Sequence, residues 1–150
     1  MAKMDSTNRR ILQVLSADGR ISNLELAEKV GLSPSACLRR VQELERTGVI
    51  TGYRAVLDPG AMGVGFVAYI GVGLSSHTKL AQETFERAVA RSPEVVECHN
   101  ITGTIEYLLR VECPDLPSYK TFHTDVLGTL PHVNALTSYV VMGSPKDLRA

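Results

Sequence analysis

Apolar residues in the first third of the chain recur every three or four positions, in three short runs. This spacing is typical of amphipathic helices and predicts helices over residues 5–16, 22–30 and 34–47. Gly31 ends the second run, because glycine accepts the left-handed conformation found where helices end. Ser33 begins the third, since its hydroxyl can cap a helix whose first residue is a proline.

The second and third predicted helices form a helix-turn-helix, a motif whose second helix enters the major groove of DNA. Ser22 and Glu25 make a Ser-x-x-Glu capping box at the start of the motif. In the second helix of the motif, Cys37, Val41 and Leu44 share one face, which we expect to point into the core. Cap, turn, proline and basic helix together favour a DNA-binding unit.

A different face of the helix over 34–47 carries groups that can contact DNA. Its members follow helical spacing: Ser35, Arg39, Gln42 and Arg46. Arginine on such a face can bind guanine through two hydrogen bonds. A charged stripe is often only a solvated surface, but here it coincides with the caps and the turn. The predicted DNA-binding residues also include Ser33 and Pro34, with Arg20, Asn23, Arg40 and Arg54 as candidates for the phosphate backbone.

Residues 49–57 follow this helix and are rich in β-branched and aromatic residues, which favour strands. The Asp-Pro-Gly sequence after them predicts a turn. A short β element behind a helix-turn-helix is typical of a wing. We therefore predict a winged helix-turn-helix DNA-binding domain over 1–57 and a linker over 58–65.

From residue 66 onward, short apolar runs alternate with amphipathic helical stretches. The predicted strands and helices cover 66–74, 78–91, 95–101, 106–113, 115–130 and 133–142 in the order β-α-β-β-α-β. The side chains expected to be buried on the two helices are Leu80, Ala81, Phe85, Ala88 and Val89, then Tyr119, Phe122, Val126 and Leu130.

This order defines a ferredoxin-like sandwich, with both helices on one face of an antiparallel sheet. The predicted fold class is therefore α+β, a winged helix-turn-helix joined to a ferredoxin-like domain over 66–150. The uncovered face of the sheet is expected to carry apolar residues from several strands and to pack against a second copy, forming a dimer.

The charge of the chain is divided between the two regions. Residues 1–57 hold nine basic and six acidic residues, and residues 58–150 hold seven and ten, so the formal charges are +3 and −3. The positive region is the one with the helix-turn-helix, as binding to phosphates requires. No apolar run is long enough to span a membrane, so a soluble cytoplasmic protein is expected.

The residues suited to catalysis or metal binding form no recognisable set. The three cysteines are far apart in the sequence, which predicts buried reduced thiols: Cys37, Cys98 and Cys113. Neither a catalytic triad nor a phosphate-binding loop is present. We therefore predict no enzyme activity, cofactor or metal site.

Three stretches carry a resemblance that covers nearly the whole chain: residues 18–53, 95–109 (VVECHNITGTIEYLL) and 138–142 (SYVVM). The chain resembles the leucine-responsive and asparagine-responsive (Lrp/AsnC, feast/famine) transcription regulators. The resemblance implies a winged helix-turn-helix joined to a domain that senses amino acids. It also implies dimers that assemble into octamers, with small effectors, commonly amino acids, bound between subunits.

The family's effector region corresponds to the turn after the second strand of the sandwich, with a typical pattern Gly-Asp-x-Asp-Tyr. Here the turn holds Ile101, Thr102, Gly103, Thr104, Ile105, Glu106 and Tyr107, with threonine and glutamate in place of the two aspartates. Backbone N–H groups around Gly103 can bind a carboxylate. Glu106 can pair with an ammonium group and Tyr107 can pack or donate a hydrogen bond. The alternative is an ordinary hairpin with a structural glycine.

Together these features predict a sequence-specific transcription regulator whose assembly and DNA affinity respond to a small effector, which we expect to be an amino acid. One alternative is an architectural protein that binds DNA without any effector. A less favoured alternative is a small enzyme on the ferredoxin-like scaffold, since this fold hosts many functions.

Overall fold

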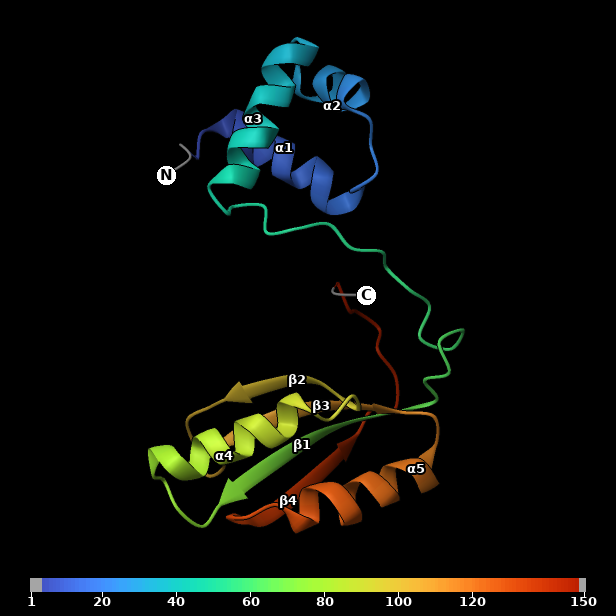
Figure 1. Cartoon of the computed structure of the whole chain (residues 1–150). Helices are drawn as coiled ribbons and strands as arrows, with labels where there is room; N and C mark the ends of the chain where they lie inside the picture. The colour runs from blue at the N-terminus through green and yellow to red at the C-terminus, as the bar shows by residue number, and fades with distance from the viewer. Residues whose placement is uncertain (1–3, 149–150) are drawn as a thin grey trace. The chain divides into compact units, whose positions relative to one another are not determined.

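The computed structural model describes residues 4–148 and divides the chain into two compact units (Figure 1). The first extends to Val56 and the second begins at Leu57. Each unit buries its own hydrophobic cluster. In the described part of the chain, no helix is long and apolar enough to cross a lipid bilayer.

The first unit consists of three helices: α1 (Ser6–Ala17), α2 (Asn23–Val30) and α3 (Pro34–Arg46). The capping box of α2 is present, because Ser22 accepts a hydrogen bond from the Glu25 N–H and Glu25 accepts one from the Ser22 N–H. Gly31 ends α2 with a φ of 71°, in the left-handed region. The Ser33 hydroxyl accepts a hydrogen bond from the Ala36 N–H and so caps α3. The predicted helices and their caps are confirmed.

The core of this unit forms where the three helices meet. Cys37 and Leu44 of α3 are fully buried, and Val41 is half-buried against the same cluster, which confirms the predicted inner face. The other buried members of the cluster are Ile11, Leu26, Ala27 and Val30. The opposite side of α3 is thereby left facing solvent.

The predicted β element behind α3 is not formed. Residues 49–57 contain no strand, and the side chains from Thr51 to Leu57 are exposed. A strand needs a neighbour for its ladder of hydrogen bonds, and the sheet recorded among residues 4–148 lies in the other unit. The segment is instead held at Tyr53, whose hydroxyl donates a hydrogen bond to Glu45 of α3 at 2.8 Å.

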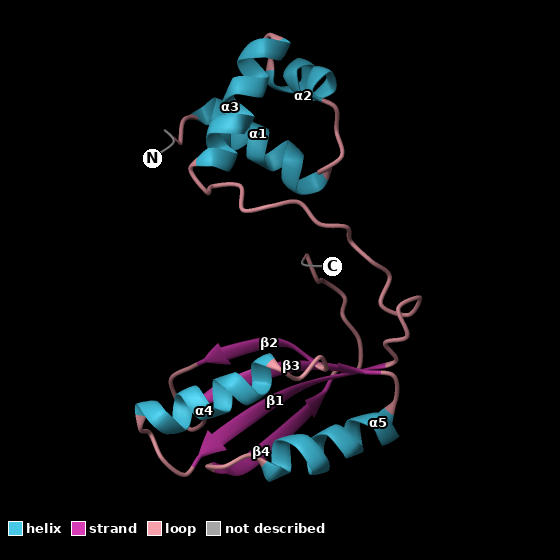
Figure 2. Cartoon of the chain, in the orientation of Figure 1, coloured by secondary structure: helices cyan, strands magenta, loops and turns pink. Residues whose placement is uncertain are grey.

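The second unit is a four-stranded antiparallel sheet with two helices on one face (Figure 2). Its elements are β1 (Phe66–Leu74), α4 (Lys79–Ala90), β2 (Val95–Asn100), β3 (Tyr107–Cys113), α5 (Leu116–Thr121) and β4 (Val133–Val140). The strands lie in the order β2-β3-β1-β4. The predicted order of elements is confirmed.

The helix predicted over 115–130 is interrupted. After α5 the chain passes through a π-helical turn, Phe122–Val126, and a 3₁₀ turn, Leu127–Thr129. A π turn contains an extra residue, so the side chains that follow it are rotated about the helix axis. As a result Leu127, which the regular spacing omitted, is fully buried, whereas Leu130 is only half-buried.

Alternate residues of β1 and β3 face the helices and form the core of the second unit with Phe85, whose ring centroid lies 4.7 Å from that of Tyr107. Two predictions about burial are wrong. Leu80 is 66% exposed, because it lies in the first turn of α4, about 100° around the axis from the buried Ala81. Cys98 is exposed because β2 is an edge strand, whereas the other two cysteines are buried.

The uncovered face of the sheet carries apolar residues from more than one strand, as predicted, together with charged side chains. Val67 and Tyr69 of β1 lie on it, because their neighbours in the strand point into the core. The register places Arg110 opposite Tyr69 and Glu112 opposite Val67, and these two charged side chains form an ion pair. Tyr139 of β4 lies on the other side of Tyr69. The face therefore combines aromatic rings with a half-buried ion pair.

Candidate functional site

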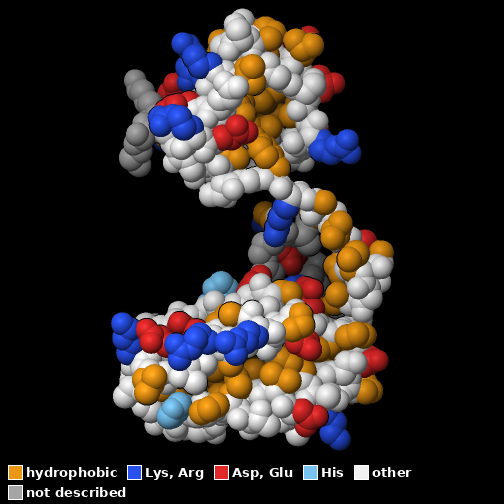
Figure 3. All heavy atoms as spheres, in the orientation of Figure 1, with side chains coloured by type: hydrophobic (Ala, Val, Ile, Leu, Met, Phe, Trp, Pro, Cys, Tyr) orange, Lys and Arg blue, Asp and Glu red, His pale blue; other side chains and the backbone are white. Residues whose placement is uncertain are grey.

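Basic side chains are scattered over both units in the face seen in Figure 3. On the first unit, Lys and Arg side chains stand at separate places, beside acidic ones. On the second unit, a row of Lys and Arg side chains crosses α4, again with acidic neighbours. The distribution of charge in this view therefore does not locate a DNA-binding surface. The positions of the side chains on α3 are more informative.

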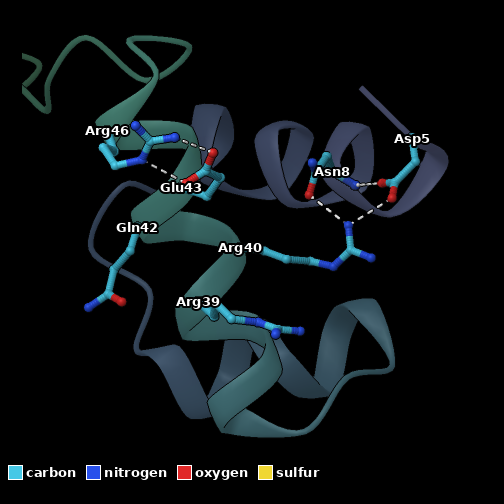
Figure 4. A pocket seen from close by; sticks show the side chains of 7 residues that line it. All are labelled: Asp5, Asn8, Arg39, Arg40, Gln42, Glu43 and Arg46. Atoms are coloured by element: carbon cyan, nitrogen blue, oxygen red, sulfur yellow. Dashed lines mark hydrogen bonds and ion pairs between the residues drawn. The ribbon is translucent and has the colours of Figure 1, made fainter. Parts of the chain in front are cut away.

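The four residues predicted to face DNA are all exposed on α3: Ser35, Arg39, Gln42 and Arg46. Arg39, Gln42 and Arg46 line an open hollow of about 620 Å³ between α3 and the start of α1 (Figure 4). The hollow is completed by Asp5, Asn8, Arg40 and Glu43. The structure thus brings together most of the predicted contact face of α3.

The three arginines of α3 differ in what they contact. Arg39 forms no hydrogen bond or ion pair with the other residues that line the hollow, and it lies exposed on α3 (Figure 4). Arg46 donates two hydrogen bonds to Glu43, at 2.8 and 2.7 Å. This bonding holds the pKa of the Glu43 carboxyl below its usual range.

Arg40 is turned toward α1. Its guanidinium donates to Asp5 at 2.8 Å and to the side-chain oxygen of Asn8 at 3.0 Å. The other carboxylate oxygen of Asp5 accepts the N–H of Asn8 and so caps α1. Arg40 therefore ties α3 to the start of α1, and its predicted contact with phosphate stays a prediction.

Asp5→Ala is expected to lower the free energy of unfolding of the first unit by about 0.5–2 kcal/mol, because it removes the cap of α1. Thermal melting measured by circular dichroism checks this. Asp5→Asn is the matched variant, since asparagine caps equally well but lacks the charge that Arg40 contacts. Losses of equal size in both variants would show that the charge, not the cap, carries the effect.

The other candidates for DNA contact occupy varied positions. Asn23 donates its side-chain N–H to the carbonyl of Pro34 at 2.9 Å, which joins α2 to α3. Ser33 caps α3 through its hydroxyl, so this side chain has a structural role in the fold of the first unit. Arg20 in the turn before α2 and Arg54 behind α3 are exposed. The burial of Arg20, Asn23, Ser33 and Arg54 does not distinguish DNA contacts from other surface residues, so their roles stay predictions.

The predicted effector turn joins β2 to β3. The Ile101 N–H donates to the carbonyl of Glu106 at 2.9 Å and closes the turn. Residues 102–104 are exposed, and Gly103 has a φ of 128° that favours glycine. Ile105 lies over Gly71 of β1. The turn thus presents its backbone at one end of the sheet.

Glu106 is already engaged within the chain. One of its carboxylate oxygens accepts the Leu74 N–H at 2.6 Å, and the other lies 3.2 Å from Nδ1 of His77. The Glu106 side chain is 16% exposed, whereas that of His77 is 78% exposed. His77 was missed by sequence reasoning, since nothing in the sequence brings the loop after β1 to the start of β3.

Tyr107 is a core residue, because it is 1% exposed and its hydroxyl donates to Glu86 of α4 at 2.6 Å. Burial is the main cause that raises the pKa of Tyr107, and the hydrogen bond to Glu86 raises it further. Its ring packs in the core and does not line the surface of the turn. The part of the turn that a ligand can reach therefore includes residues 102–104 and one edge of Glu106, but not the ring of Tyr107.

Two family models match the chain. The model described as the Lrp/AsnC ligand binding domain matches residues 67–150, and a winged helix-turn-helix DNA-binding model matches residues 4–51. The leucine-responsive regulatory protein of Escherichia coli is 41% identical over 144 residues, which cover 96% of this chain and 88% of that protein. The chain belongs to the Lrp/AsnC family. It is accordingly a DNA-binding transcription regulator with a ligand-binding domain, and not an enzyme.

Solved structures of Lrp/AsnC regulators share the fold of the whole chain. A transcriptional regulator from Neisseria meningitidis, crystallised as a complex with L-Met, has a TM-score of 0.93 and 38% identity, covering 97% of this chain and 94% of that one. A feast or famine regulatory protein from M. tuberculosis complexed with L-methionine has a TM-score of 0.84 and 27% identity, covering 99% and 98%. The α+β class and the two-part architecture of this Lrp/AsnC chain are thereby confirmed.

Proposed function

We propose that this Lrp/AsnC regulator binds duplex DNA sequence-specifically through α3. The observation that carries the proposal is the exposed guanidinium of Arg39 beside Gln42, on a helix capped by Ser33 and buried on its other face. Arginine and glutamine form two-bond contacts with guanine and adenine in the major groove. Ser35 and Arg46 extend this face, and Arg20, Asn23 and Arg54 supply contacts to the DNA backbone.

We propose that the effector is an amino acid bound at the turn of residues 101–107. Two structures of relatives were solved with methionine. An amino acid carries a carboxylate, which backbone N–H groups around Gly103 can bind, and an ammonium group, which suits Glu106. For this to happen, the ammonium group has to replace His77 at the second oxygen of Glu106.

We further propose that the protein assembles into dimers through the uncovered sheet face and into octamers as four dimers, in the cytoplasm. A dimer presents two copies of α3 to two half-sites, which gives one short helix a useful affinity. An effector that binds one assembly better than another shifts the equilibrium between them and, with it, DNA affinity. No cofactor is part of this mechanism.

The deciding experiment is a gel shift on the protein's own upstream DNA combined with light scattering, with and without single amino acids, at stated salt concentration. We expect binding of that DNA over a scrambled duplex, and a change in affinity or particle mass with at least one of leucine and methionine. Specific binding without any response would favour the architectural alternative. Equal binding of both duplexes would contradict sequence-specific recognition.

Glu106→Gln is expected to weaken the binding of L-leucine or L-methionine, whichever binds, by about 10-fold, because an amide forms a weaker hydrogen bond with an ammonium group than a carboxylate does. Isothermal titration calorimetry measures this. Glu94→Gln removes the same charge at the opposite end of β3, where the Glu94 carbonyl accepts the Glu112 N–H, and should leave the affinity unchanged. If the affinity were also unchanged in Glu106→Gln, Glu106 would not contact the ligand, and its role would be the structural hydrogen bond with Leu74.

A further inference from the structure

Glu43 and Arg46 form a two-bond ion pair on the solvent side of α3 (Figure 4). Nε of Arg46 donates to one carboxylate oxygen at 2.8 Å and a terminal guanidinium nitrogen donates to the other at 2.7 Å. The side chains are 70% exposed for Arg46 and 45% exposed for Glu43. The two residues are one helical turn apart, so the pair forms within a single rigid element.

This pair makes Arg46 a poor ligand for phosphate. A carboxylate in contact with the guanidinium cancels most of its charge at a distance, and it repels an approaching phosphate. The lowered pKa of the Glu43 carboxyl, caused first by its hydrogen bond with Arg46, keeps the carboxylate ionised at neutral pH. An arginine that served only to neutralise phosphate would gain nothing from Glu43.

What Arg46 retains is a planar edge of hydrogen-bond donors. A guanidinium has five N–H groups, and the two bonds to Glu43 leave three of them on the terminal nitrogens. Two parallel N–H donors match O6 and N7 of guanine. The free edge of the guanidinium that Glu43 holds is therefore complementary to the guanine of a G·C base pair.

The position of the pair on α3 fits this role. Arg46 shares a face with Arg39, seven residues earlier, and with Gln42. We propose that Glu43 is a positioning residue that fixes the guanidinium of Arg46 to read one G·C pair in the major groove. The proposal rests on the proposed function of α3 and adds a specificity-determining residue that the sequence analysis did not include.

The test compares operator and scrambled duplexes by fluorescence anisotropy at several salt concentrations. The operator is a duplex that the unmodified protein selects from a random library. Glu43→Ala should lower the ratio of operator to scrambled affinity by about 5-fold or more and weaken the preference for guanine at one position. Its affinity for scrambled DNA should rise, because a negative charge has been removed.

Arg46→Ala should lower the same ratio and leave the salt dependence of binding nearly unchanged. The double variant should be no worse than Arg46→Ala, since Glu43 acts through Arg46. Glu28→Ala, which removes an exposed acidic side chain from α2, is the matched control and should keep the ratio. Thermal melting confirms that each variant is folded.

Three outcomes would overturn the proposal. If the ratio of operator to scrambled affinity were unchanged in Glu43→Ala, Glu43 would have no role in DNA recognition. Equal weakening of both duplexes by Arg46→Ala, with a salt slope reduced by about one, would make Arg46 a phosphate contact. Additive effects in the double variant would show that Glu43 and Arg46 act on DNA binding independently. A wild-type protein that selects no operator would instead contradict the proposed function itself.

Discussion

Leu44→Ala is expected to unfold the first unit and to abolish DNA binding. Leu44 is fully buried where α3 meets the other two helices. Replacing a buried leucine by alanine costs about 2–5 kcal/mol, because the lost contacts leave a cavity. A three-helix unit of this size has only a few kcal/mol of stability to lose. Circular dichroism and the gel shift should therefore both show the loss.

Leu38→Ala is the matched control for this experiment. Leu38 lies on the same helix but is 45% exposed, so the same substitution should change stability by less than about 1 kcal/mol. Native-state hydrogen exchange adds a second readout, since the second unit has a separate core and should keep its protection in Leu44→Ala. Loss of protection in both units together would show that the two cores unfold as one.

Arg39→Ala is expected to weaken binding to the operator by about 1–3 kcal/mol, which is the range for an arginine that contacts guanine through two hydrogen bonds. The physical reason is that Arg39 is exposed on α3 and forms no hydrogen bond or ion pair with the other residues that line the hollow, so none of them competes with DNA for it. The measurement is anisotropy on operator and scrambled duplexes. The loss should be confined to the operator, so that specificity falls along with affinity.

Arg87→Ala provides the control, because it removes the same side chain and charge from α4 of the other unit. We expect little change in either affinity for that variant. If Arg39→Ala weakened both duplexes equally and lowered the salt slope by about one, Arg39 would be a phosphate contact. If it changed neither affinity, the proposed contact face of α3 would be wrong.

The elements that the sequence predicted correctly have local causes. A capping box, a left-handed glycine and a serine before proline act within a few residues, so Ser22, Gly31 and Ser33 mark the ends of α2 and α3 wherever the rest of the chain lies. The errors arise where a distant neighbour decides. Residues 49–57 have strand propensity but no neighbouring strand, and Cys98 is exposed because β2 is at the edge of the sheet.

The same distinction applies to the site. The exposed face of α3 follows from helical spacing, and the partnership of Glu43 with Arg46 follows from their separation of three residues. Arg40 contacts Asp5 and Asn8, and Glu106 contacts Leu74. In each case the partners are 32 or more residues apart in the sequence, so no local rule predicts the contact. Tyr107 was placed beside a ligand by resemblance, whereas packing against Phe85 places its ring in the core.

The hydrophobic clusters of the two units share no residue in the described part of the chain, and Thr51 to Leu57 between them are exposed. A crossover within that exposed segment would therefore join the helix-turn-helix of one regulator to the sandwich of another without remodelling the interior of either. Gene duplication followed by such exchange offers a direct route for pairing an old metabolic signal with new promoters.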